Sequence, residues 1–183
     1  MLRIISGKVK GKKLATPRGK EIRPTPVRLR KRLFDILGYD IMDSHFLDGF
    51  AGTGAVGLEA YSLGAERVVF IESDPEAIKI LRKNIERVGA PPNIRVIEAE
   101  FNMGVRKLYQ EGEKFDFVFI DPPYDFLEKA NPLKILYKKD VLEPEGLILF
   151  QKGCGQRIKK MFFEVVREIK EGKNCILFLR REG

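Results

Sequence analysis

Short apolar runs alternate with amphipathic stretches through most of this chain. The runs are rich in aromatic and β-branched residues, which is typical of buried strands. In the stretches between them, apolar residues recur every three or four positions, which indicates helices. The expected strands cover 46–48, 67–72, 94–97, 115–120 and 147–150, and the expected helices cover 54–63, 75–88, 103–110 and 127–138. This alternation predicts an α/β fold with a doubly wound, mostly parallel sheet covered by helices.

The C-terminal part has a different pattern. We expect a short helix at 156–160 and then strands at 163–169 and 175–179. The turn sequence Glu171-Gly172-Lys173-Asn174 joins the two strands and is a hairpin signal. The hairpin would complete a seven-stranded sheet and place one antiparallel strand in it.

The N-terminal part combines Gly, Pro and Lys and predicts a short hairpin or extended arm, with 3–5 and 13–15 as possible strands. A helix from about Pro26 to Leu37 would follow, because proline suits a first helical turn. We therefore expect a basic N-terminal extension at 1–38 and a second domain at 39–183.

Charge is distributed unevenly along the 183 residues. Residues 1–32 hold twelve Lys or Arg and one acid, whereas the rest of the chain has more acids than bases. This asymmetry favours a polyanionic partner, and nucleic acid rather than a membrane, because no apolar face accompanies the first twenty residues. The alternative is a solvated basic arm that aids solubility.

Several classes of protein are disfavoured. No apolar stretch approaches the length that spans a bilayer, and the N-terminus lacks the apolar segment of a signal peptide. Cys154 and Cys175 are far apart and lack CxxC spacing, so we expect two ordinary thiols in a reduced, cytoplasmic protein. His45 is the only histidine, which argues against zinc, and we expect it at a strand start or cap rather than as a base.

A glycine-rich turn follows the first strand and reads Asp48-Gly49-Phe50-Ala51-Gly52-Thr53-Gly54-Ala55-Val56-Gly57. Glycines let the backbone approach a ligand, and free N–H groups at the following helix start favour an anionic or polar guest. Glu72 ends the next strand, where an acid holds ribose hydroxyls in dinucleotide-binding folds.

Three interpretations of this turn compete. A nicotinamide or flavin enzyme would need a second half or a catalytic domain, for which the chain has little room. A P-loop is excluded because no Gly-Lys-Ser/Thr follows the glycines. S-adenosylmethionine would give Asp48 a role beside its ammonium group. Glu100 would then accept from the adenine amino group and Phe101 would stack on the ring, although Glu100 could equally be a solvated loop acid.

The sequence Asp121-Pro122-Pro123-Tyr124 follows the buried run 115–120. Ligands bind at the carboxyl ends of strands in open α/β sheets, and the two prolines stiffen the corner. Asp121 and the Pro122 carbonyl would accept the hydrogens of an amine, and Tyr124 would stack on its ring. We expect catalysis to depend on this corner.

These motifs resemble the class I methyltransferases that act on exocyclic amines. Together with Arg3-Ile4-Ile5-Ser6-Gly7-Lys8, Gly11-Lys12-Lys13-Leu14, Arg23-Pro24-Thr25, Arg28-x-Arg30 and Gly57-Leu58-Glu59-Ala60, the chain resembles the RsmD-type small-subunit (16S) ribosomal RNA guanine-N2 methyltransferases. The resemblance covers essentially the whole chain. It departs from the family pattern at Val27, Lys31 and Asp35.

The resemblance implies a Rossmann-like fold, S-adenosylmethionine as cofactor, and a monomer acting on ribosomal RNA in an assembling small subunit. The residues it places at the cofactor are Asp48, Phe50, Ala51, Gly52, Thr53, Gly54, Glu72, Ser73, Glu100, Phe101 and Asp121. The residues it places at RNA are Arg3, Lys8, Lys12, Lys13, Arg23, Thr25, Arg28 and Arg30. Catalysis is assigned to Asp121, Pro122, Pro123 and Tyr124.

Other functions fit part of the pattern. A DNA adenine-N6 or protein glutamine-N5 methyltransferase uses a related acid-or-amide-Pro-Pro-aromatic corner. A non-catalytic RNA-binding module could retain the fold, although the intact acids Asp48, Glu72 and Asp121 disfavour it. A Ser-His-Asp hydrolase would need a G-x-S-x-G elbow, which is missing.

Overall fold

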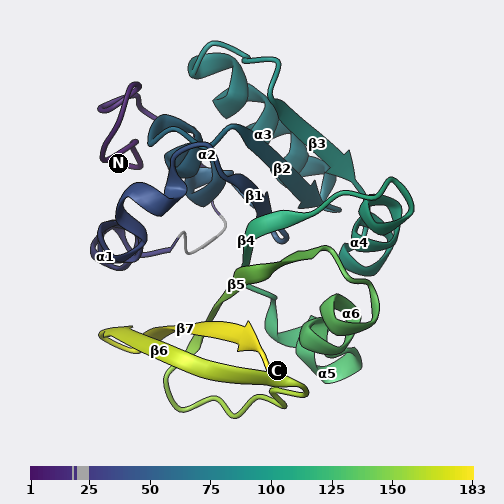
Figure 1. Cartoon of the computed structure of the whole chain (residues 1–183). Helices are drawn as coiled ribbons and strands as arrows, with labels where there is room; N and C mark the ends of the chain where they lie inside the picture. Colours follow the sequence, from purple (N-terminus) through teal and green to yellow (C-terminus); the bar gives the residue numbers. More distant parts are fainter. Residues whose placement is uncertain (18, 20–24) are drawn as a thin grey trace.

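One mixed sheet organises the molecule (Figure 1). The computed structural model describes residues 1–17, 19 and 25–183, so Arg23, which we expected at RNA, lies outside the described residues. Within them the sheet has seven strands in the order β3-β2-β1-β4-β5-β7-β6. The strands are β1 His45–Asp48, β2 Arg67–Glu72, β3 Ile94–Glu98, β4 Phe115–Ile120, β5 Leu142–Gly153, β6 Phe163–Glu171 and β7 Asn174–Arg181.

The predicted fold class is confirmed. The five strands from β1 to β5 are parallel, and β7 pairs antiparallel with both β5 and β6. The strand order reverses around β1, which lies between β2 and β4. At such a switch point the loops after neighbouring strands lead to opposite faces and leave a crevice between them. The carboxyl ends of β1, β2 and β4 therefore frame a natural ligand site.

Helices cover both faces of the sheet. They are α1 Val27–Leu37, α2 Ala55–Ser62, α3 Pro75–Arg87, α4 Phe101–Gln110, α5 Tyr124–Lys129 and α6 Pro132–Lys138, with a 3-10 turn η1 at Gly38–Ile41. Figure 1 shows α1 and α2 on one side of the sheet and α4, α5 and α6 on the other. Successive strand residues serve opposite cores: Phe46 packs with the α1–α3 side and Leu47 with the α4–α6 side. This period of two explains why the central strands are apolar throughout.

The N-terminal segment packs against α2. Leu2, Ile4 and Leu14 are buried in the same core as α1, and the backbone pairs Ile4 with Lys12 and Leu14 with Leu2. The two possible strands that we expected here are reduced to a single antiparallel bridge between Arg3 and Lys13.

The element boundaries differ from the prediction most in the three places that follow, and by one to three residues at several other ends. The expected helix at 127–138 is two helices, because the Asn131 side chain caps a new helix that starts at Pro132. The short helix expected at 156–160 does not form. β5 begins at Leu142 rather than at Leu147 and extends to Gly153.

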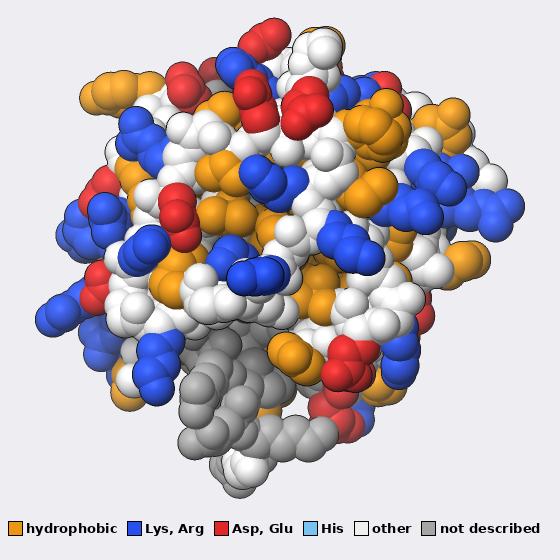
Figure 2. Space-filling view, turned by 90° about the horizontal axis from the view of Figure 1, so that it is seen from below, with side chains coloured by type: hydrophobic (Ala, Val, Ile, Leu, Met, Phe, Trp, Pro, Cys, Tyr) orange, Lys and Arg blue, Asp and Glu red, His pale blue; other side chains and the backbone are white. Residues whose placement is uncertain are grey.

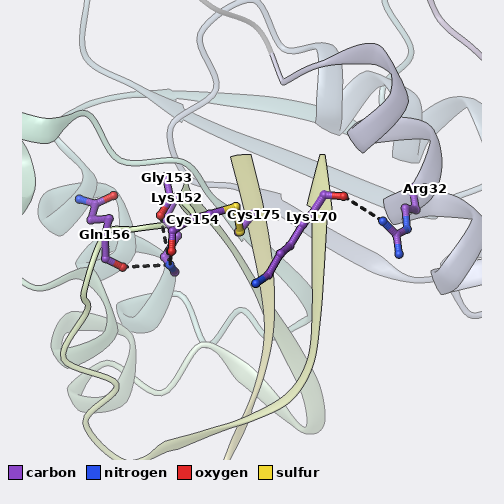
Figure 3. Close-up of a disulfide and its surroundings, with 7 residues drawn as sticks. All are labelled: Arg32, Lys152, Gly153, Cys154, Gln156, Lys170 and Cys175. Atoms are coloured by element: carbon purple, nitrogen blue, oxygen red, sulfur yellow. Dashed lines mark hydrogen bonds between the residues drawn. A yellow bond between two sulfur atoms is a disulfide. The ribbon is translucent and has the colours of Figure 1, made fainter. Parts of the chain in front are cut away.

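The two cysteines correct the prediction of ordinary thiols. Cys154 and Cys175 form a disulfide whose Cα atoms are 5.1 Å apart (Figure 3). The two cysteines are far apart in sequence, and the antiparallel pairing of β5 with β7 brings them together. Cys175 pairs with Lys152, and the Cys154 N–H donates to the Lys173 carbonyl at 2.9 Å. A Cα separation of this size lies in the normal range for a disulfide. The bridge joins the end of β5 to the start of β7.

Candidate active site

A cavity of about 550 Å³ opens at the carboxyl ends of β1, β2 and β4. This volume lies within the range of small-molecule and cofactor sites. The residues expected at the cofactor that line it are Asp48, Phe50, Ala51, Gly52, Thr53, Glu72, Ser73, Glu100, Phe101 and Asp121. Gly54, Pro122 and Tyr124 lie beside the cavity without lining it, whereas Pro123 lines it. Residues from the loops after β1, β2, β3 and β4 thus converge on one site.

The glycine-rich turn enters α2 through two left-handed residues. Gly52 has φ 55° and Gly54, the N-cap of α2, has φ 80°, a conformation that favours glycine. The Gly52 N–H donates to Glu72 Oε2 at 2.7 Å. A Cβ on Gly52 would meet nothing within 4 Å, so the turn leaves open space beside its backbone. The turn has the shape of a ligand cradle.

Asp48 is the most deeply buried acid of the site. It is 1% exposed, and its Oδ2 accepts the Gly57 N–H at 3.1 Å. Its Oδ1 has no hydrogen-bond partner among the described residues. Burial raises the pKa of Asp48 to about 7; the Gly57 hydrogen bond opposes this shift, and the charges of Glu72 and Asp121 add to it. A buried acceptor without a donor suits a ligand that brings a positively charged or N–H group.

Glu72 organises the turn around itself. Besides the Gly52 bond, its Oε1 accepts the backbone N–H groups of Ser73 and Asp74, each at 2.9 Å. The carboxylate is therefore held in place by backbone donors from two loops. Lone pairs remain on both oxygens, as a role toward ribose hydroxyls requires.

Three phenylalanines form one wall. Phe50 stacks on Phe101 with ring centroids 4.7 Å apart, and Phe126 meets both rings edge-on. Phe101 is 2% exposed and has little free ring surface, because Phe50 covers it. Phe50 and Phe126 are half-buried and offer more surface to a flat ligand than Phe101 does. Glu100, the N-cap of α4, is exposed at this wall.

The Pro-Pro corner follows β4. Asp121 Oδ2 accepts from Gln151 Nε2 at 3.1 Å, and burial of the carboxyl group raises the pKa of Asp121 to about 7. Pro122 is buried, whereas Tyr124 is 71% exposed at the start of α5. The corner thus presents a recessed carboxyl group next to an uncovered aromatic ring.

Several lining residues were missed by sequence reasoning. Asp125, Phe126 and Lys129 line the cavity, Gln151 contacts Asp121, and Thr25, which we expected at RNA, also lines the cavity. Proximity to Tyr124 was the available signal for the residues of α5. Nothing in the local sequence singles out Gln151, because its position depends on the pairing of β5 with β4.

The residues expected at RNA separate into two groups. Arg3, Lys8, Lys12, Lys13 and Arg28 are exposed. Arg30 is 0% exposed, and its side chain donates to the Arg3 carbonyl and lies beside Glu59, so the prediction that it contacts phosphate is wrong. Thr25 is also buried, and its hydroxyl is used by Gln151 rather than free for RNA.

Two absences hold for the described residues. None of the helices in this part of the chain is long and apolar enough to cross a membrane. Residues 1–17, 19 and 25–183 contain no cluster of three His, Cys, Asp or Glu side chains suited to a metal ion.

Comparison with known proteins finds relatives in sequence and in fold. The chain is 40% identical over 147 residues to the ribosomal RNA small subunit methyltransferase D of Escherichia coli K12, covering 80% of this chain and 72% of that protein. A hypothetical protein of Thermus thermophilus superposes with a TM-score of 0.85 at 34% identity, covering 98% of this chain and 99% of the other. An RNA methyltransferase of Salinibacter ruber, solved with S-adenosyl-L-homocysteine, shares the fold with a TM-score of 0.66 at 17% identity, over 86% and 92% of the two chains.

The family model described as conserved hypothetical protein 95 matches residues 2–180. With the relative from Escherichia coli, this match shows that the chain belongs to the family of the ribosomal RNA small subunit methyltransferases D.

Proposed function

We propose that this protein transfers a methyl group from S-adenosylmethionine to the exocyclic N2 amine of a guanine in small-subunit ribosomal RNA. The observation that carries the proposal is the convergence of Asp121, the glycine-rich turn and Asp48 on one cavity. The family supports methylation of ribosomal RNA, and the S-adenosyl-L-homocysteine in a structure of the same fold supports the cofactor. The choice of guanine N2 rests on the resemblance of the N-terminal block.

The cavity fits the cofactor in four respects. The unpartnered Asp48 Oδ1 suits its ammonium group, and the Glu72 carboxylate suits its ribose hydroxyls. The open space at Gly52 lets the ligand approach the backbone. Glu100 and the wall of Phe50 and Phe126 would hold the adenine. When bound, the cofactor supplies a methyl group on a positively charged sulfur, which requires no metal ion and no covalent nucleophile from the protein.

The protein's own residues prepare the amine. An amine on an aromatic ring is a poor nucleophile because its lone pair is conjugated with the ring. Asp121 and the Pro122 carbonyl would accept its two hydrogens and favour a pyramidal nitrogen. Alignment of this kind is worth roughly 7–11 kcal/mol. One proton leaves the amine as the new bond forms, and a carboxylate with a pKa of about 7 is a suitable acceptor.

The exposed ring of Tyr124 would stack on the target base. The base must leave its neighbours to reach Asp121, and a side chain that is 71% exposed is accessible to it. Stacking contributes about 1–3 kcal/mol per base.

The surface near the corner would hold the RNA backbone. The exposed basic side chains on α5, on α6 and in the segment between β5 and β6 are Lys129, Lys134, Lys138, Arg157, Lys159 and Lys160. These elements occupy the lower part of Figure 1, and Figure 2, which views the molecule from below, shows Lys and Arg spread over this face with most Asp and Glu towards its edges. Together with the exposed lysines and arginines of residues 1–38, they would contact phosphates. Such contacts position RNA without reading its sequence.

The remaining parts of the proposal are those that the resemblance implies. The substrate would be RNA within an assembling small subunit, the enzyme would act as a monomer, and it would work in the cytoplasm. Residues 1–38 would serve RNA contact and residues 39–183 methyl transfer, with Thr25 as a residue of the first part that lines the cavity of the second.

The test is transfer of labelled methyl groups to small subunits from cells that lack the enzyme, followed by nucleoside analysis. We expect N2-methylguanosine from the wild-type protein and none from Asp121→Ala, with cofactor affinity retained in the variant. Asp40→Ala, which alters an exposed acid of η1, is the matched control. N6-methyladenosine, a methylated protein, or near-wild-type turnover by Asp121→Ala would refute the proposal.

A further inference from the structure

A chain of two hydrogen bonds connects the segment before α1 to the Pro-Pro corner. The Thr25 hydroxyl donates to Gln151 Oε1 at 2.8 Å, and Gln151 Nε2 donates to Asp121 Oδ2 at 3.1 Å. Thr25 and Gln151 are each 6% exposed. Ile120, the last residue of β4, pairs with Phe150 of β5, so Asp121 just after β4 comes beside Gln151 on β5.

The chain has a defined direction. Gln151 can donate to the carboxylate only with its NH₂ toward Asp121, and its carbonyl then faces Thr25. The Thr25 hydroxyl has a donor to offer that carbonyl. If the amide turned over, its oxygen would face the carboxylate of Asp121. The Asp121 carboxylate therefore sets the amide orientation, and the Thr25 hydroxyl stabilises it by donating to the amide oxygen.

The surroundings of Asp121 explain why this support matters. Asp48 ends the neighbouring strand β1, where it pairs with Phe119, while Glu72 ends β2 and Glu100 caps the start of α4. From α5, Asp125 and Lys129 line the same cavity, and Lys129 is the one base among the described lining residues. Burial raises the pKa of Asp121, most charged side chains that line its cavity are acidic, and the side chain that donates to it is a neutral amide.

We propose that Gln151 and Thr25 are positioning residues that fix the Asp121 carboxylate with Oδ2 occupied, leaving Oδ1 as the oxygen available to the substrate amine. This inference rests on the proposed function of Asp121. A hydrogen bond to the charged form also favours the carboxylate over the acid, so the pair would keep Asp121 competent at neutral pH. Neither residue needs to touch the cofactor or the RNA for this role.

Through Thr25 the segment before α1 is linked to the Pro-Pro corner. Thr25 is separated from Gln151 by 126 positions and precedes Pro26 and α1. The support of the carboxylate therefore includes a residue of the basic N-terminal part, and the two parts of the chain contribute to one polar network.

The test uses Gln151→Leu and Thr25→Val, which remove the donor and keep the size of the side chain. Gln110→Leu and Thr16→Val, at exposed positions outside the cavity, are the matched controls. Thr25→Ser keeps the hydroxyl and should restore wild-type behaviour. The first readout is direct titration of the Asp121 carboxyl by carbon-13 NMR, with its resonance assigned from Asp121→Asn.

We expect Gln151→Leu to raise the pKa of Asp121 by about one unit, and Thr25→Val to raise it by less. The acid limb of methyl transfer should move to higher pH by the same amount, while the Kd of the cofactor stays unchanged. Wild-type titration in Gln151→Leu, or Thr25→Ser no closer to wild type than Thr25→Val, would overturn the inference.

Failure of the inference and failure of the proposed function give different results. The carboxyl titration needs no RNA, so it reports on the pair even if the protein methylates another substrate. If Gln151→Leu does not fold, as judged by its thermal transition, the same titration on Thr25→Val decides the matter.

Discussion

The Arg30 guanidinium lies 3.5 Å from the Glu59 carboxylate, and both side chains are shielded from solvent. Glu59 also accepts the backbone N–H groups of Ile5 and Ser6, while Arg30 donates to the Arg3 carbonyl. Burial lowers the pKa of Arg30 and raises that of Glu59, and each charge opposes the shift of the other. The pair thus joins α1, α2 and the N-terminal segment.

Removing one partner of this pair should be costly. We expect Arg30→Met to lower the free energy of unfolding by about 3–5 kcal/mol, because it leaves the Glu59 carboxylate buried without its cation. Arg28→Met on the same helix should change stability by less than about 0.5 kcal/mol, since the Arg28 side chain is 87% exposed. Urea denaturation measures both. Equal effects of the two variants would contradict the assignment.

Asp48 should make stability depend on pH. Its folded pKa of about 7 lies above the ordinary value of 3.8, so the folded state holds the proton more tightly. Stability is therefore lost as pH rises through this window, and the ionised form is penalised above it. Asp48→Asn should be more stable than wild type at about pH 8 by about 2–4 kcal/mol, and no more stable at about pH 4. The exposed Asp40→Asn should show neither change in denaturation at the two pH values.

Two glycines of the turn should respond differently to alanine. A Cβ on Gly57 would lie 2.4 Å from the Phe70 ring, so Gly57→Ala should destabilise the fold by about 1–3 kcal/mol. At Gly52 a Cβ meets nothing, and the left-handed φ costs about 1–2 kcal/mol. Gly52→Ala should also weaken cofactor binding. Calorimetric titration and thermal unfolding separate the two effects, and unchanged affinity in Gly52→Ala would argue against the cradle.

The disulfide should stabilise the protein under oxidising conditions. It closes a loop of 21 residues, for which the loss of chain entropy in the unfolded state is worth about 3 kcal/mol. Cys154→Ser with Cys175→Ser should unfold at a lower denaturant concentration than wild type, and a reducing agent should bring the wild type to the same midpoint. A wild-type midpoint indifferent to reducing agent would show that the bridge contributes nothing.

RNA binding should weaken steeply with salt. Contacts from exposed lysines to phosphates release counterions, so log K should fall linearly with log salt concentration. Lys12→Ala and Lys13→Ala should each reduce the slope by about one, whereas Arg30→Met should leave it unchanged in the folded protein. A flat dependence for the wild type would favour a basic segment that only aids solubility.

The central sheet was predictable because its strands carry their own signal. β2 and β4 have the predicted limits, since each is an apolar run between polar turns. β5 was predicted too short because Glu143, Pro144 and Glu145 interrupt its apolar pattern. The break before α6 had a local signal in Asn131-Pro132, which the amphipathic pattern outweighed.

The site was predictable where its residues are close together in sequence. The glycine-rich turn and the Pro-Pro corner are short motifs at strand ends, and the parallel sheet brings them to one edge. The link from Thr25 through Gln151 to Asp121 joins residues from distant segments, and its geometry exists only once β5 has paired with β4. Arg30 was misassigned for a related reason: its partner Glu59 comes from α2, and sequence order does not reveal that contact.

The hydrogen bonds from Ile5 and Ser6 to Glu59 determine how the function of the basic N-terminal segment can be tested. Deletion of the N-terminal segment would remove Leu2, Ile4 and Leu14 from the hydrophobic core. It would also leave the buried Glu59 carboxylate without the backbone donors of Ile5 and Ser6. Loss of RNA binding in a truncated protein would then reflect loss of the folded structure rather than loss of RNA contacts. Substitution of individual exposed lysines is the experiment that separates RNA binding from stability of the fold.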